Sequence, residues 1–415
     1  MRARNYHFIR VFLIIILLFV MFIAGFIVRG YPNFLASLGF PESITGIKQS
    51  DIVDANASKK DVYNSLSARV SEVEDILATD SLDTYNLDVV TESALGAFAE
   101  ACDDPYLRYY SEGRYASLNA QSEGYSGIGV LFSEHNGQAY VVDVFEGAPA
   151  QTEGVREGDF VVSINGDNSQ TWSRSEVAAV LSQLKGSSVV ITWRRPESIE
   201  ADGGEEFTTT LACEEYGEKN VTRDYSEDRR VGYIKVKQFT QDSSSLVQKA
   251  IKKLKEQGAK AFVLDLRDNP GGYLSEAVGI AGEFMRSGTV VEVQTKDGIS
   301  AKTASGQPAT DAPLVVLANK NTAAAAEVVV AALKESQRAY AIVGTTTLGK
   351  GSVQVLRDLT FGGALRYTAA YYLTPEGHAI DKVGVAPTVT LGASAEGDSQ
   401  RDYAIELAGS LVSAE

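Results

Sequence analysis

The residues around Lys350 suggest that its amine could act as a general base. It lies between two glycines in the stretch TTTLGKGSVQ, directly after the apolar run YAIVG. A lysine can act as a general base only if burial lowers the pKa of its amine from about 10.4 toward about 7 or 8. Gln354, four residues further on, could hold that amine in place. A lysine on a surface loop is the alternative interpretation, and the spacing differs from that of a phosphate-binding loop.

Two neighbouring glycines could support the same chemistry. Gly271 and Gly272 close an apolar strand in the stretch LDLRDNPGGYL. Glycines let backbone N–H donors come close to a bound carbonyl oxygen, which is the geometry of an oxyanion hole. A tight loop before a helix explains the pattern equally well.

A third stretch lies where many hydrolases carry a nucleophile. NKNTAAAAEVVVAAL, residues 319–333, follows the strand-like run PLVVLANK and opens a helix. It offers four alanines and no side chain that could attack a carbonyl. Few residues elsewhere could form a metal site or a catalytic site based on histidine, because the chain holds only His7, His135 and His378.

A separate segment could bind the end of a peptide. In SGIGVLF, the glycines of the loop Gly127, Ile128, Gly129 and Val130 let backbone N–H groups turn toward one carboxylate, and the next strand offers an edge to an extended chain. Together with GAPAQTEGVREGDFVVSINGDNS, this segment resembles a PDZ domain. Short strands with turn signals and one helix, SRSEVAAVLSQL, place this module at residues 119–213.

The elements that must position these residues differ along the chain. Residues 61–118 read as a helical region, with Leu66, Val70, Val73 and Leu77 on one face. That face suits an ordinary packed hairpin, with a helical dimer arm as the alternative. Residues 214–415 alternate strands with helices, and their near-continuous apolar strands predict an α/β layered domain with helices on both faces of the sheet.

Composition and the N-terminus limit location and partners. The 415 residues carry a formal charge of −16, which argues against nucleic acid as a partner. Residues 11–28 hold no charge and are long enough for a transmembrane helix, preceded by arginines in residues 1–10. We expect a cytoplasmic N-terminus, a tether at residues 29–60 and an extracytoplasmic domain, in a single-pass cell-membrane protein. A cleaved signal peptide is the alternative. The two cysteines, Cys102 and Cys213, cannot form a disulfide framework.

Taken together, these motifs resemble the carboxyl-terminal processing, or tail-specific, proteases, which are serine peptidases with an inserted PDZ domain. The resemblance extends over about residues 60–410 through DDPYLRYYS, GYIKVKQF, LDLRDNPGG, LGKGSVQ and YYLTPEGHAIDKVGVAPT. It implies an α/β, crotonase-like protease core (ββα layers) with an inserted PDZ domain, an N-terminal helical region and one transmembrane helix. An acyl-CoA enzyme of crotonase type would share only the fold.

The resemblance also assigns roles to residues. Lys350 matches the general base of a Ser-Lys site and Gln354 its orienting residue. Gly271, Gly272 and Ala325 match the backbone donors of the oxyanion hole. The family's nucleophilic serine belongs at position 324, where this chain has Ala324.

Alanine at position 324 would prevent catalysis by the route that the family uses. A methyl group cannot attack a carbonyl, so covalent catalysis by this chain is disabled. A single Ser-to-Ala change at an otherwise intact site is typical of a deliberately inactivated mutant, and a natural pseudoprotease acting as a tail-binding scaffold or adaptor is the alternative. The resemblance implies protein or peptide substrates with free C-termini, no cofactor and no metal, and it is compatible with a homodimer. An empty PDZ module could block the site until a tail binds.

Overall fold

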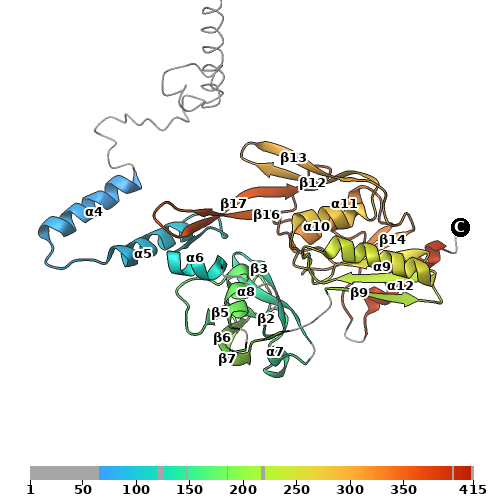
Figure 1. Cartoon of the computed structure of the whole chain (residues 1–415), viewed down its shortest axis with the longest axis horizontal. Coiled ribbons are helices and arrows are strands. Elements are labelled where there is room, and N and C mark those ends of the chain that lie inside the picture. Colours follow the sequence, from blue (N-terminus) through green and yellow to red (C-terminus); the bar gives the residue numbers. More distant parts are fainter. Residues whose placement is uncertain are drawn as a thin grey trace, which may run out of the picture. The chain divides into compact units, whose positions relative to one another are not determined.

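A computed structural model describes residues 65–119, 126–145, 147–184, 186–215, 220–394 and 397–412 (Figure 1). The expected cytoplasmic N-terminus (1–10), anchor (11–28) and tether (29–60) lie outside these ranges. Within the described ranges, no helix has the length and apolar character needed to cross a bilayer. By its contacts the chain divides into two compact units, Met1–Asn86 and Leu87–Glu415.

Helix α4 (Leu66–Asp80) is the described helix of the first unit. Ser65 caps its N-terminus, because the serine hydroxyl accepts a hydrogen bond from a backbone N–H of the first turn. None of its residues is buried. The predicted burial of its apolar face in a packed hairpin is therefore not seen in the described residues. The exposed side chains on that face are Leu66, Val70, Val73 and Leu77.

A six-stranded sheet forms the centre of the second unit. Its order is β18-β15-β14-β11-β10-β9, and neighbouring strands are parallel except for the antiparallel pair β9 and β10. The strands are β9 (Val221–Ser226), β10 (Val231–Val236), β11 (Ala261–Asp265), β14 (Leu314–Ala318), β15 (Ala341–Gly344) and β18 (Val389–Thr390).

Helices cover both faces of this sheet, which confirms the layered α/β prediction. In β11, Phe262 and Leu264 pack into one cluster with the first helical layer, whereas Ala261 and Val263 pack into another with α12. Both faces of the strand are therefore shielded from solvent, which explains its uninterrupted run of apolar residues. The first layer comprises α9 (Ser243–Gln257), α10 (Leu274–Gly282) and α11 (Ala325–Glu335), and α12 spans Ser399–Val412 (Figure 1).

A second, antiparallel sheet differs from the sequence-based expectation. The run TVVEVQT fits the series of strand and helix repeats, but its strand β12 pairs with β13 and β17 instead. The order is β1-β17-β12-β13, with β16 also paired to β17. The strands are β1 (Arg108–Tyr110), β12 (Ser287–Thr295), β13 (Gly298–Ser305), β16 (Ser352–Asp358) and β17 (Ala364–Leu373). A strand from the expected helical region 61–118 therefore joins this sheet, beyond α5 (Leu87–Glu100) and before α6 (Glu112–Asn119).

The β-rich module has the predicted strands and helix. Its five-stranded antiparallel sheet runs in the order β3-β4-β5-β6-β7, so β3 lies at an edge. Ser173 and Glu176 form a capping box that starts α8. The elements are β3 (Val130–His135), β4 (Gln138–Val144), α7 (Pro149–Thr152), β5 (Phe160–Ile164), α8 (Arg174–Gln183), β6 (Ser188–Arg195) and β7 (Glu205–Ala212).

The two ends of this module lie side by side. Strand β2 (Ser126–Gly127) enters it and strand β8 (Glu214–Glu215) leaves it, and the two form an antiparallel ribbon. Cys213, next to β8, is buried, Cys102 is exposed, and both are free thiols.

Candidate active site

Ala324 lies at a strained turn between β14 and α11. Its backbone has φ 52° and ψ −121°, in a region that residues with a Cβ adopt only at a cost of about 1–3 kcal/mol. A sharp, strained turn from a strand into a helix is how α/β hydrolases expose a nucleophile. The backbone of residue 324 therefore has the form of a nucleophile position although its side chain is a methyl group.

Hydrogen bonds join this turn to the loop after β11. The Ala323 N–H donates to the Asn269 carbonyl over 2.9 Å, and the Thr322 hydroxyl donates to the Leu266 carbonyl over 2.8 Å. Thr322 is also buried and therefore points into the protein. Its hydroxyl is therefore already engaged in hydrogen bonds within the protein.

The predicted glycine turn meets this strained turn. A Cβ on Gly271 would lie 2.8 Å from both Ala323 O and Ala325 N and 3.1 Å from Ala324 Cβ, so only glycine fits there. The Gly271 N–H donates to Asn269 Oδ1 over 2.8 Å in this arrangement. The role of Gly271, Gly272 and Ala325 as oxyanion donors stays a prediction.

Glu327 connects the two halves of the site. Its Oε2 accepts hydrogen bonds from the backbone N–H groups of Ala324 and Lys350, each over 2.8 Å. Its Oε1 accepts from the Gly349 N–H over 2.7 Å and from the Thr347 hydroxyl over 2.5 Å. The side chain is fully buried, and burial raises the pKa of Glu327 to about 7 against the effect of these donors.

The sequence analysis assigns no role to Glu327, although the local sequence contains an indication of one. The signal was present, because a glutamate at the third position of a helix commonly accepts a hydrogen bond from the backbone at the helix start. Here the same carboxylate also binds the loop that carries Lys350, which the local pattern does not reveal.

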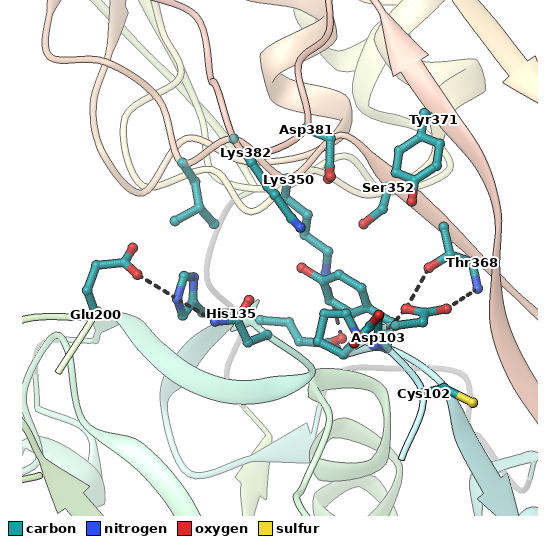
Figure 2. A pocket seen from close by; sticks show the side chains of 17 residues that line it. Cys102, Asp103, His135, Glu200, Lys350, Ser352, Thr368, Tyr371, Asp381 and Lys382 are labelled. Carbon is teal, nitrogen blue, oxygen red and sulfur yellow. Dashed lines mark hydrogen bonds and ion pairs between the residues drawn. The ribbon is translucent and has the colours of Figure 1, made fainter. Parts of the chain in front are cut away.

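Lys350 projects into a cavity of about 720 Å³ between the second sheet and the β-rich module. Figure 2 shows it with Ser352 and Asp381 on one side and His135 on the other. Only 13% of its side chain is exposed, and burial lowers the pKa of its amine, as a general base requires. The Gln354 amide donates to Ser352 Oγ over 3.0 Å, so its predicted orienting contact with Lys350 stays a prediction.

The cavity contains a counter-ion that the sequence did not reveal. Glu134 Oε1 lies 3.9 Å from Lys350 Nζ and accepts a hydrogen bond from Arg366 Nη2 over 2.6 Å. The ring of Tyr106 lies under the ammonium, with its centroid 5.3 Å from Nζ. Burial opposes the charge of Glu134, but Lys350 and Arg366 outweigh it and hold the pKa of Glu134 well below its usual range.

Backbone hydrogen bonding and core packing hold the predicted carboxylate loop of the β-rich module. Gly129 has φ 77°, and its carbonyl accepts from the Phe145 N–H over 2.9 Å. Ile128 and Val130 are fully buried, so the loop is held from below by the module's core. Directly after the loop, β3 has a sheet neighbour on one side only, and α8 packs near it.

His135 and His378, the two histidines of the described residues, each lie near a carboxylate. His135 lines the cavity, and its Nε2 lies 3.4 Å from a Glu200 carboxylate oxygen (Figure 2). His378 is exposed and its Nδ1 lies 3.4 Å from Glu335 Oε1. Both therefore have carboxylate neighbours of their own.

Comparison with known proteins gives matches over the same regions. The family described as "Peptidase family S41" matches residues 230–391, and the "PDZ domain" family matches residues 140–195. A "Carboxyl-terminal-processing protease" of Picosynechococcus sp. is 35% identical over 299 residues, covering 71% of this chain and 71% of the relative. A "Probable CtpA-like serine protease" of Staphylococcus aureus is 30% identical over 374 residues, covering 89% of this chain and 71% of the relative.

A solved structure extends the similarity to three dimensions. The photosystem II D1 C-terminal processing protease is similar with a TM-score of 0.65 and 27% sequence identity. The alignment covers 84% of this chain and 92% of that protein. The similarity thus includes most of the residues that the structure describes.

Proposed function

The chain belongs to the carboxyl-terminal processing proteases of peptidase family S41, and on this premise we propose that it derives from a Ser-Lys endopeptidase whose nucleophile is position 324. One observation carries the proposal. Ala324 adopts the strained geometry of a nucleophile turn, and Glu327 Oε2 binds its N–H together with that of Lys350.

The parent reaction would follow from these positions. With serine at 324, neutral Lys350 takes the hydroxyl proton as the oxygen attacks a substrate carbonyl, and Gln354 orients the amine. The backbone N–H groups of Gly272 and Ala325 stabilise the oxyanion, whereas the Gly271 N–H is already held by Asn269 Oδ1. The lysine then protonates the leaving amine, and water hydrolyses the acyl-enzyme to regenerate the serine.

This chain would be an inactive form of that enzyme. Alanine has no oxygen to attack with, whatever the state of Lys350. The strained turn at Ala324, the buried amine of Lys350 and the tight Gly271 turn support the idea of a deliberately inactivated mutant. The second candidate, a natural pseudoprotease that acts as a tail-binding scaffold, is favoured by the ordered carboxylate loop of the PDZ module at Ile128 and Gly129.

Substrate selection would begin at the PDZ module. A peptide tail would add as a strand to the edge of β3, with its α-carboxylate in the loop 127–130 and α8 alongside. The apolar segment 11–28 would anchor the chain in the cell membrane, with the catalytic domain outside the cytoplasm. A second copy could cover the exposed apolar face of α4, as a homodimer would require.

Reversion of Ala324 to serine tests the function. The A324S protein is incubated with an unstructured protein substrate, and we expect cleavage products by mass spectrometry with none from the Ala324 chain. Failure of A324S to cleave, together with binding of peptides that have free C-termini, would favour the scaffold. An ester or amide probe that labels the A324S protein at position 324, and leaves the Ala324 chain unlabelled, would identify the nucleophile directly.

A further inference from the structure

Three side chains that can bind a metal ion meet at the C-terminal end of α11. Glu335 is the last residue of this helix, and Glu376 and His378 lie in the turn that follows β17. One ligand atom from each of them lies within 4.8 Å of the other two. We call these three residues the His378 triad. Other residues line the cavity around Lys350, so the triad is separate from the candidate active site.

The spacing of two ligand atoms suits a tetrahedral ion. His378 Nδ1 lies 3.4 Å from Glu335 Oε1, which is longer than the usual N–H···O hydrogen bond of about 2.7–3.2 Å. Zn²⁺ binds imidazole nitrogen and carboxylate oxygen at about 2.0–2.2 Å, so two of its tetrahedral ligands lie about 3.3–3.6 Å apart. Octahedral Mg²⁺ would bring neighbouring ligands to about 2.8–3.0 Å. The observed separation therefore favours the ion with tetrahedral geometry.

The Glu335 carboxylate is already oriented for such an ion. Only 14% of its side chain is exposed. Its Oε2 accepts a hydrogen bond from the Glu376 N–H over 2.9 Å, while Oε1 is the oxygen near His378. A ligating carboxylate in proteins commonly has its second oxygen held by a hydrogen bond of this kind.

The turn that carries the other two ligands is held by Thr374. The Thr374 N–H donates to the His378 carbonyl over 2.8 Å, and the His378 N–H donates to Thr374 Oγ1 over 3.2 Å. Gly377 lies between Glu376 and His378 with φ 82°, a conformation that favours glycine. The backbone of the two ligands is thus fixed, whereas the exposed Glu376 side chain can turn toward an ion.

The charges around the triad favour a cation. Glu292 Oε2 would lie 3.9 Å from a Cβ on Gly377, so a further carboxylate is close to the turn. Lys334, which precedes Glu335 in the helix, donates to the Ala386 carbonyl over 2.8 Å instead.

We propose that the His378 triad binds one divalent transition-metal ion of the Zn²⁺ class and thereby ties the end of α11 to the turn after β17. Three protein ligands leave a fourth position for water. The imidazole nitrogen selects Zn²⁺ over Mg²⁺ and Ca²⁺, which prefer oxygen ligands. Helix α11 has 11 residues, so the ion would lie about 15 Å from the helix start at Ala325. It takes no part in the proposed reaction, and the inference does not depend on that reaction.

Binding is measured on the full Ala324 chain without a polyhistidine tag, after removal of metal with a chelator. We expect saturable binding of one Zn²⁺ per chain by isothermal titration calorimetry. His378→Ala and Glu376→Gln replace exposed side chains, and each should weaken this binding by at least about tenfold.

The matched control is His135→Ala. His135 Nε2 also lies 3.4 Å from a carboxylate oxygen, that of Glu200, but within the part of the chain that the structure describes this pair belongs to no group of three ligands. We expect its Zn²⁺ affinity to equal that of the parent. Equal affinity of the parent and both triad variants, or lack of saturable binding, would overturn the inference.

Two further measurements test the class of the ion and its place. Co²⁺ bound to the parent should give the visible absorption of a four-coordinate ion, and Mg²⁺ should not compete with Zn²⁺. A six-coordinate Co²⁺ spectrum or equal competition by Mg²⁺ would overturn the proposed class, even where a variant fails to fold. Zn²⁺ should raise the melting temperature of the parent and leave that of His378→Ala unchanged. An equal rise in both would place the ion elsewhere and overturn the inference. None of these measurements needs turnover, so the result at A324S leaves them unaffected.

Discussion

Ala324 and Lys350 donate their backbone N–H groups to one oxygen atom, Glu327 Oε2, each over 2.8 Å. Positions 324 and 350 are thus fixed to the same carboxylate although they belong to different segments of the chain. This shared acceptor sets the spacing of the two residues through the backbone, independently of either side chain.

Loss of the amine should abolish activity in the A324S protein. Lys350→Met keeps a long side chain in the cavity but removes the base, and we expect cleavage of an unstructured protein to fall by at least about 10³-fold. Lys382→Met is the matched control, because Lys382 lines the same cavity. We expect its effect to stay below about tenfold. Comparable losses for both variants would contradict the role of Lys350.

The stability contributed by Glu327 should depend on pH. Its folded-state pKa is raised to about 7 from 4.5, so the folded protein binds the proton more tightly than the unfolded chain does. The contribution is fully present below pH 4.5 and is lost as the pH rises through about 7. We expect urea denaturation to show that the free energy of unfolding of the parent falls between about pH 5 and about pH 8. Relative to Glu327→Gln, this fall should be up to about 3 kcal/mol. A difference in the free energy of unfolding that does not change with pH would contradict this assignment.

Gly271→Ala should disrupt the site in two ways, by steric overlap of the new methyl group with neighbouring backbone atoms and by backbone strain at residue 271. Gly271 has φ 82°, and its new methyl would lie 2.8 Å from the backbone atoms Ala323 O and Ala325 N. In the A324S protein we expect a cleavage rate lower by about 10²-fold or more, because the attacking atom would move.

The control for that substitution is Gly154→Ala. Gly154 has φ 80° but nothing within 4 Å of a built Cβ, so it isolates the backbone strain of about 1–2 kcal/mol. Chemical denaturation should show a larger loss for Gly271→Ala, and only that variant should lose activity. Equal effects would mean that the contact with the nucleophile turn is unimportant.

Arg267 should be a major contributor to stability. It binds Asp265, which is fully buried, and Asp398, with N···O distances of 2.6 and 2.7 Å. Arg267→Met leaves Asp265 buried without its cation, and we expect about 3–5 kcal/mol of destabilisation by urea denaturation. Arg286→Met removes an equally short but exposed pair with Asp311 and should cost about 1 kcal/mol or less.

The sequence predicts the elements whose signal is local. Strands β11 and β14 are recognisable because their residues are apolar without interruption, and the structure covers both of their faces. The turns around Lys350 and at residues 271–272 are also recognisable from the local sequence. Their glycines allow backbone conformations that residues with a Cβ adopt only at a cost. The order of the PDZ strands follows from short alternating runs separated by turns.

The second sheet and the counter-ion of the lysine escape prediction for a physical reason. Strands β16 and β17 are partly exposed and mix polar with apolar residues, so their pattern is weak. An alternation of strand and helix does not say which sheet a strand joins, so the sequence does not reveal that β12 belongs to the antiparallel sheet. Glu134 meets Arg366 across 232 residues of sequence, a contact that only the folded chain creates.

The paired strands β2 and β8 have a mechanical consequence for the PDZ module. Entry and exit of the module share one short ribbon, Ser126–Gly127 against Glu214–Glu215, so the module's two connections to the rest of the chain are held side by side. Unpairing this ribbon would separate the two connections from each other without changing any residue of the candidate site.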